Sequence, residues 1–124
     1  MYGKIKTFKD LETWKQAHKL VLVIYELTKI FPKEEKYSLT DQIRRAVVSI
    51  SSNIAEGFAR DSKKDKIRFY SIALGSLIEV QNQLQIGFDL GYIKEELFKR
   101  VEQQITLVQK LIYGLMKSSS SRIR

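Results

Sequence analysis

A single proline, Pro32, interrupts a chain of 124 residues whose apolar side chains otherwise recur at intervals of three and four. That spacing puts apolar residues on one face of an α-helix, and no stretch keeps the period of two that would indicate a β-strand. Proline has no N–H group and its ring does not fit a helix interior, so Pro32 separates the first helix from the rest. The pattern predicts an all-α protein with four helices.

The predicted helices span residues 8–31, 39–60, 62–90 and 94–116. Three of them follow a serine or threonine that has an aspartate three residues later, an N-capping pattern: Thr7, Ser38 and Ser62. Gly91 supplies a stop after the third helix. The connections are short, which favours an antiparallel up-down-up-down bundle forming one domain over residues 1–124. We expect the polar residues 117–124 to form a flexible tail.

The charge balance favours a polyanionic partner. Twenty-two Lys and Arg residues against fourteen Asp and Glu give a net charge of +8, and nucleic acid is a commoner partner for such a chain than an anionic membrane surface.

No cysteine is present, which excludes disulfides and thiolate metal sites. The longest apolar run, residues 20–25, is too short to cross a bilayer, and the N-terminus lacks the apolar core of a signal peptide. We expect a cytoplasmic protein that does not bind membranes.

Polar residues form a strip beside the apolar faces of the second and third helices. They recur at helical intervals and comprise Ser49, Asn53, Glu56, Ser76, Glu79 and Gln83. Two adjacent antiparallel helices would bring the strips together, so we expect an interhelical hydrogen-bond network that fixes their register. Glycine weakens a helix interior, so Gly57 and Gly75 are expected to allow close approach of the two backbones.

The alternative is that Glu56 and Glu79 are catalytic or metal-binding carboxylates. A di-iron bundle requires Glu-x-x-His pairs, but His18 is the only histidine and has no glutamate three residues before it. The chain also lacks a Ser/His/Asp set, a glycine-rich phosphate loop and zinc-ligand spacing. We therefore expect no catalytic residue, no metal and no cofactor.

The first helix carries a second apolar row about 100° around its axis from the first. This row consists of Leu20, Val23, Leu27 and Ile30. Exposed apolar patches of this size usually bind something, so we predict that the row is an interface between subunits of a homo-oligomer. A central position of the first helix in the fold is the other explanation.

Two groups of basic residues are candidates for phosphate contact. Arg44 and Arg45 are predicted on the outer side of the second helix, and five more residues crowd the junction of the second and third helices: Arg60, Lys63, Lys64, Lys66 and Arg68. Each group alone is commonly a solvated surface. Because neither an RNP-type aromatic motif nor helix-turn-helix spacing is present, any binding should depend on backbone charge and shape.

The segment 42–57, QIRRAVVSISSNIAEG, resembles the signature of the four-helix proteins encoded within intervening sequences of bacterial 23S rRNA genes, also called the S23 ribosomal protein family. Further matches occur at 8–14, 31–35, 69–79 and 89–93. The chain is also similar to the accessory variability determinant of diversity-generating retroelements, a basic pentamer that binds nucleic acid and a reverse transcriptase. The resemblance implies an antiparallel bundle that assembles into a ring, a homopentamer. It implies mostly architectural roles for the residues that match the signature: Arg44, Arg45, Asn53, Glu56, Gly57 and Glu79.

Two functional hypotheses follow from these features. The first is a non-enzymatic, oligomeric, bacterial protein that binds structured RNA or DNA through basic surface residues. The second is an interaction scaffold that organises a partner enzyme without contacting nucleic acid, its positive charge serving solubility or an acidic partner protein.

Overall fold

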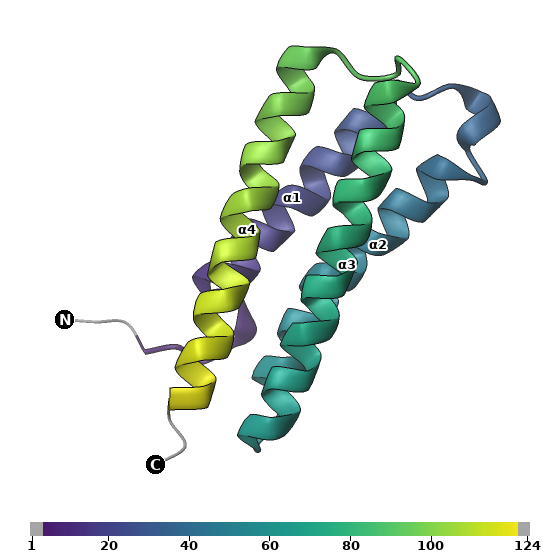
Figure 1. Cartoon of the computed structure of the whole chain (residues 1–124). Helices are drawn as coiled ribbons and strands as arrows, with labels where there is room; N and C mark the ends of the chain where they lie inside the picture. The colour runs from purple at the N-terminus through teal and green to yellow at the C-terminus, as the bar shows by residue number, and fades with distance from the viewer. Residues whose placement is uncertain (1–3, 122–124) are drawn as a thin grey trace.

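The computed structural model describes residues 4–121, with side chains up to residue 119. Four helices form the fold: α1 (Glu12–Thr28), α2 (Leu39–Phe58), α3 (Lys63–Asp89) and α4 (Glu95–Ser121). Short 3-10 helices, η1 (Phe8–Asp10) and η2 (Lys33–Glu35), precede α1 and α2. The chain reverses direction at each connection (Figure 1). Since no strand occurs within the described range, the predicted all-α class is confirmed.

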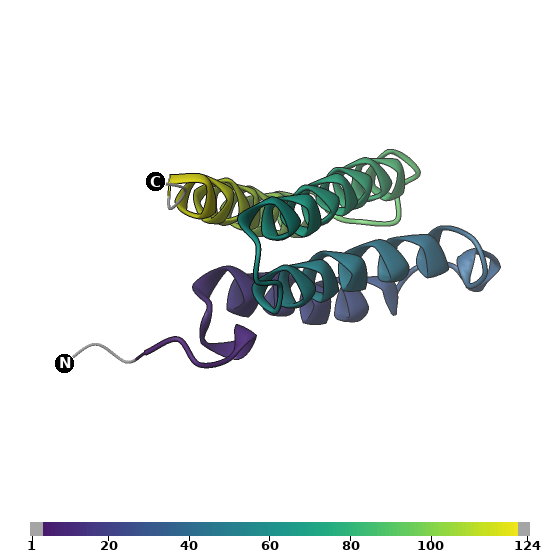
Figure 2. The ribbon, with the colours of Figure 1, turned by 90° about the horizontal axis from the view of Figure 1, so that it is seen from below.

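The helices form two layers. Figure 2 shows α1 and α2 side by side in one layer and α3 and α4 in the other. Each helix contacts the next along the chain, α4 also contacts α1, and the contact between α2 and α3 is the most extensive. The layers enclose a core to which every helix contributes completely buried residues, among them Ile24, Ile50, Leu77 and Ile105. Each such side chain stabilises the fold by about 1.5–3 kcal/mol through removal of apolar surface from water.

The first helix begins later than its apolar pattern predicts. Thr7 caps η1 rather than α1: its Oγ1 accepts from the Lys9 N–H at 3.2 Å, while Asp10 Oδ2 accepts from the Thr7 N–H at 3.0 Å. Backbone N–H groups donating to the Asp10 carboxylate lower the pKa of Asp10. Leu11 is then extended, with φ −73° and ψ 128°, so the α-helix starts at Glu12.

The last helix ends later than predicted. It continues to Ser121, so the residues expected to form a flexible tail are helical as far as the structure describes them; 122–124 lie outside the described residues. Ser119 is buried and lines a pocket with Phe58 and Tyr70, which come from α2 and α3. Contact with the rest of the fold therefore stabilises a serine-rich turn that local propensity would leave frayed.

A hydrogen bond joins two connections at one end of the bundle. The Tyr92 hydroxyl, between α3 and α4, donates to Glu35 Oε2 at 2.8 Å, and Glu35 Oε1 accepts from the Leu39 N–H at 3.2 Å. The hydrogen bond to the carboxylate raises the pKa of Tyr92. Gly91 adopts φ +84° just after α3, in agreement with its predicted role as the stop of that helix.

Among residues 4–121, no helix is both long and apolar enough to span a membrane.

Candidate nucleic-acid interface

The junction of α2 and α3 holds two guanidinium groups over one aromatic ring. The Cζ atoms of Arg60 and Arg68 lie 4.6 and 5.1 Å from the centroid of the Phe69 ring. Both arginines are exposed, and Arg60, just past the end of α2, also donates to Glu56 Oε2 at 2.8 Å. Attraction between a cation and the face of a ring holds each guanidinium in place. The junction therefore presents two fixed positive groups to solvent.

The first turn of α3 adds to this positive charge. Lys63 is half-buried and Lys64 is exposed, while Asp65 is the only acidic residue in the same turn. The N-terminus of a helix carries a partial positive charge that favours acidic residues, so two lysines here oppose the ordinary preference. Such an arrangement is stabilised when an anion lies nearby.

Lys66 is engaged within the fold. Its Nζ donates to the backbone oxygens of Phe58, at 2.8 Å, and Gly57, at 3.3 Å. These carbonyl groups are in the last turn of α2, where the N–H groups four residues further on are missing; the Gly57 oxygen also accepts from the Arg60 N–H at 3.2 Å. Lys66 therefore caps α2, and the basic residues that the junction presents outward are Arg60, Lys63, Lys64 and Arg68, which we call the basic junction.

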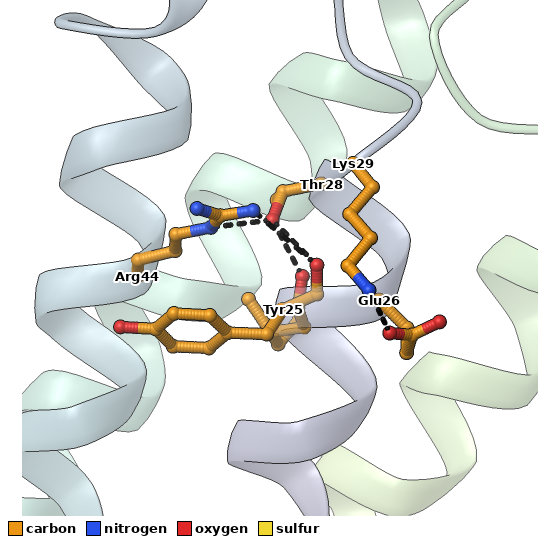
Figure 3. Close-up of polar contacts among 6 residues, drawn as sticks. Tyr25, Glu26, Thr28, Lys29 and Arg44 are labelled. Carbon is orange, nitrogen blue, oxygen red and sulfur yellow. Dashed lines mark hydrogen bonds and ion pairs between the residues drawn. The ribbon is translucent and has the colours of Figure 1, made fainter.

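Arg44 is half-buried and contacts α1, rather than standing free on the outer side of α2 as predicted. Its Nε donates to Thr28 Oγ1 at 2.8 Å and its Nη2 to the Tyr25 backbone oxygen at 3.3 Å, as drawn in Figure 3. The guanidinium also lies 4.6 Å from the centroid of the Tyr25 ring. An arginine side chain is long enough to reach from α2 to the last turn of α1, where it binds a terminal carbonyl group. Arg44 therefore links two helices, and the pairing of Tyr25 with Arg44 was not foreseen from the sequence.

Arg45 remains exposed but lies far from the basic junction. Its side chain is 80% exposed, and Nε donates to Asp41 Oδ2 at 3.0 Å. Arg45 and Arg60 are fifteen positions apart, which corresponds to roughly 22 Å along a helix. The fold does not bring these two predicted phosphate-binding residues together.

Three of the six predicted network residues meet between α2 and α3. The Ser49 and Ser76 hydroxyl oxygens are 2.8 Å apart, and Asn53 Nδ2 donates to the Ser49 backbone oxygen at 2.8 Å and to its Oγ at 3.0 Å. Glu56 instead pairs with Arg60, and Glu79 is exposed. Gln83 is buried, but its Oε1 has no hydrogen-bond partner among the described residues.

A pocket of about 280 Å³ opens beside this network. The residues that line it come from α2 and α3: Gln42, Arg45, Ala46, Ser49, Glu79 and Gln83.

The carboxylates of the polar strips do not assemble a metal site, since no group of three potential ligands occurs among residues 4–121. His18 stacks on the Trp14 ring at a centroid separation of 4.7 Å.

The glycines of the two helices differ in their surroundings. A Cβ on Gly57 would lie 2.5 Å from Cε1 of the buried Tyr70 ring, so this glycine allows α2 to approach α3. A Cβ on Gly75 would meet nothing within 4 Å, and the expectation that Gly75 serves close packing is wrong.

The second apolar row of the first helix divides between core and surface. Leu20 and Leu27 are buried within the chain's own core, because α1 contacts both α2 and α4 and both of its apolar rows are covered. This corrects the prediction that the whole row is a subunit interface. Val23 and Ile30 line an apolar groove of about 410 Å³ between α1 and α4, which we call the α1–α4 groove. Exposed Leu22 lines the same groove.

Comparison with known proteins adds the following findings. The model of the 23S rRNA-intervening sequence protein family matches residues 9–114. Among solved structures, a protein of unknown function from the S23 ribosomal protein family of Bacteroides thetaiotaomicron is similar, with 26% identity and a TM-score of 0.78. The match covers 85% of this chain and 98% of that one. No curated protein matches the chain.

Proposed function

Because the chain belongs to the 23S rRNA-intervening sequence protein family, we propose that it is a non-enzymatic helical protein that binds structured RNA or DNA. The observation that carries this proposal is the basic junction, where Arg60 and Arg68 share the ring of Phe69 beside Lys63 and Lys64. Oriented cations on a chain of net charge +8 suit the phosphate backbone, which dominates nucleic-acid affinity.

Binding through phosphates has a measurable consequence. Each phosphate that a cationic side chain neutralises in duplex nucleic acid steepens the dependence of log K on log salt by about 0.9. Four contacts from the basic junction give a slope of about −3.6 per protomer. Shape and backbone charge, rather than base sequence, would set the affinity for the duplex parts of the ligand.

The experiment is a titration of nuclease-treated protein against labelled structured RNA and duplex DNA at several salt concentrations. Submicromolar binding that weakens steeply with salt supports the proposal. Absence of binding even at low salt contradicts it and favours an interaction scaffold instead.

The scaffold is the second candidate, and the α1–α4 groove favours it. Leu22 and Ile30 are 56% and 61% exposed there, an apolar surface that a protein could cover. Specific recovery of one protein partner after nuclease treatment, without any binding of purified nucleic acid, would support this function.

Under the nucleic-acid-binding function, by contrast, we propose that the groove joins copies of this chain, since the family resemblance implies a ring of five. In a ring, each copy repeats the basic junction. Repetition multiplies the phosphate contacts available to one long ligand and raises its avidity without any new kind of contact.

A further inference from the structure

We propose that the start of α1 carries a second nucleic-acid site, where an unpaired nucleobase stacks on the exposed ring of His18. The site consists of the rings of Phe8, Trp14 and His18, which we call the aromatic stack. This inference rests on the proposed function. It adds a site for single-stranded segments to the basic junction, which holds phosphate.

The rings of the aromatic stack contact one another in sequence. The Trp14 and His18 rings are nearly parallel, at 13°, with centroids 4.7 Å apart, and the Phe8 ring meets Trp14 at 67° and 5.2 Å. Phe8 and Trp14 are half-buried, whereas His18 is exposed. Trp14 is the only ring that contacts the imidazole within residues 4–121. The fold therefore holds Trp14, Trp14 orients His18, and the other face of the imidazole is open to a ligand.

An open ring face above a second ring suits an unpaired base. Every nucleobase has a flat π-face, and proteins that bind single strands combine aromatic platforms with a positively charged surface. A base on His18 would continue the stack that Trp14 begins. A base within an intact duplex is covered on both faces by its neighbours, so the site should select loops, bulges or single strands.

The surface around the aromatic stack is basic. Residues 4–19 contain five lysines and two acidic residues. Both carboxylates already accept hydrogen bonds within the chain: Asp10 from the Lys6 N–H at 2.8 Å, and Glu12 from Gln16 Nε2 at 2.7 Å. The phosphates on either side of a stacked base would therefore find cations nearby. The lysines are all exposed: Lys4, Lys6, Lys9, Lys15 and Lys19.

One ligand can reach both the aromatic stack and the basic junction. The start of α1 and the connection of α2 to α3 lie at the same end of the bundle (Figure 1). Leu11, just before α1, lines one pocket with Phe58 and Lys66 from α2 and α3. His18 is seven positions further on, roughly 10 Å along the helix. A duplex with an unpaired strand could place phosphates at the junction and a base on His18.

The test uses the fluorescence of Trp14, which is the only tryptophan of the chain and so reports on this site. Its ligands are single-stranded 12-mers of deoxyuridine and of uridine, an abasic 12-mer with the same number of phosphates, and a duplex. Calorimetry should show the base-bearing strands binding about tenfold more tightly than the abasic strand. They should also change the Trp14 emission, which the abasic strand and the duplex should leave unchanged. The two base-bearing strands differ only in the 2′-hydroxyl, so their relative affinity distinguishes RNA from DNA as the preferred strand.

Three variants separate stacking from charge. His18→Leu covers Trp14 with an aliphatic group that has no flat face, and His18→Tyr restores a flat ring. The leucine variant should lose the tenfold preference for base-bearing strands, and the tyrosine variant should keep it. Tyr113→Leu removes a ring that is 52% exposed on α4 and should change neither affinity nor emission. Circular dichroism should show wild-type helicity in all three, because the substituted side chains are exposed.

Two results would overturn the aromatic stack as a nucleobase site. One is equal affinity of the wild type for base-bearing and abasic strands, and the other is an undiminished preference in His18→Leu. Either leaves the proposed function intact as long as duplex binding weakens with salt. If the wild type binds none of the oligomers at any salt concentration, the proposed function fails together with this site, which is a different result.

Discussion

At the scale of single residues, position on a helical wheel did not reveal where a long side chain would go. Arg44 and Arg45 are neighbours in sequence, and both were assigned to an outer surface. Arg45 is exposed there, whereas Arg44 reaches across to Thr28 and Tyr25 on α1. The apolar period fixes the direction of the Cα–Cβ bond. It does not fix which of two adjacent arginines reaches a backbone carbonyl near the end of a neighbouring helix.

This difference predicts unequal costs for the same substitution. Arg44→Met leaves the Thr28 hydroxyl and the Tyr25 carbonyl group without this donor and should lower the free energy of unfolding by about 1–2 kcal/mol. Arg45→Met removes only an exposed pair with Asp41 and should cost about 0–0.5 kcal/mol. Urea unfolding of the two variants measures both values, and equal losses would contradict the helix-linking role of Arg44.

At the scale of elements, the sequence predicted the helices well and their ends less well. Four segments with apolar spacings of three and four became four helices, because burial of one face stabilises a helix whatever its local sequence. The ends depend on individual contacts. Thr7 caps a short 3-10 helix instead of α1, and α4 continues past its apolar residues through a buried Ser119.

The two helical glycines test the packing of α2 on α3. Gly57→Ala places a methyl group against the buried Tyr70 ring, and the resulting overpacking should cost about 1–3 kcal/mol of stability. Gly75→Ala faces open space in a helix interior and should raise stability by about 0.5–1 kcal/mol. Chemical denaturation separates these outcomes. Equal effects at the two positions would contradict the close approach at Gly57.

At the scale of the whole molecule, the candidate site was only partly foreseeable. Charge counting found the basic junction, but the role of Phe69 as a shared ring and of Lys66 as a cap of α2 came from tertiary contacts. The polar strips predicted a hydrogen-bond network between α2 and α3, and Ser49 does meet Ser76 there. They did not predict that Gln83 would be buried with its Oε1 unpaired among the residues that the structure describes, since that depends on how the two helices pack.

Assembly also belongs to this scale. If copies join through the α1–α4 groove, Leu22→Glu with Ile30→Glu should convert an oligomer into a folded monomer, because buried carboxylates without partners destabilise the interface. Ile72→Glu with Ile78→Glu, at two exposed positions on α3, is the matched control and should leave the oligomer intact. Light scattering with circular dichroism measures mass and helicity. A wild type that is already monomeric would contradict assembly through this groove.

The most direct test of the proposed function is the salt dependence of nucleic-acid binding in two variants of equal charge. Lys63→Gln, Lys64→Gln and Arg68→Gln together remove three cations of the basic junction, leaving Arg60 in its pair with Glu56. Lys29→Gln, Lys33→Gln and Lys36→Gln remove three exposed cations near the connection of α1 and α2, at the opposite end of the bundle (Figure 1). With duplex RNA or DNA, the junction variant should show a slope of log K against log salt that is shallower by about 2.7, while the second variant keeps the wild-type slope. Equal slopes in the two variants would show that the basic junction is not where the protein holds phosphate.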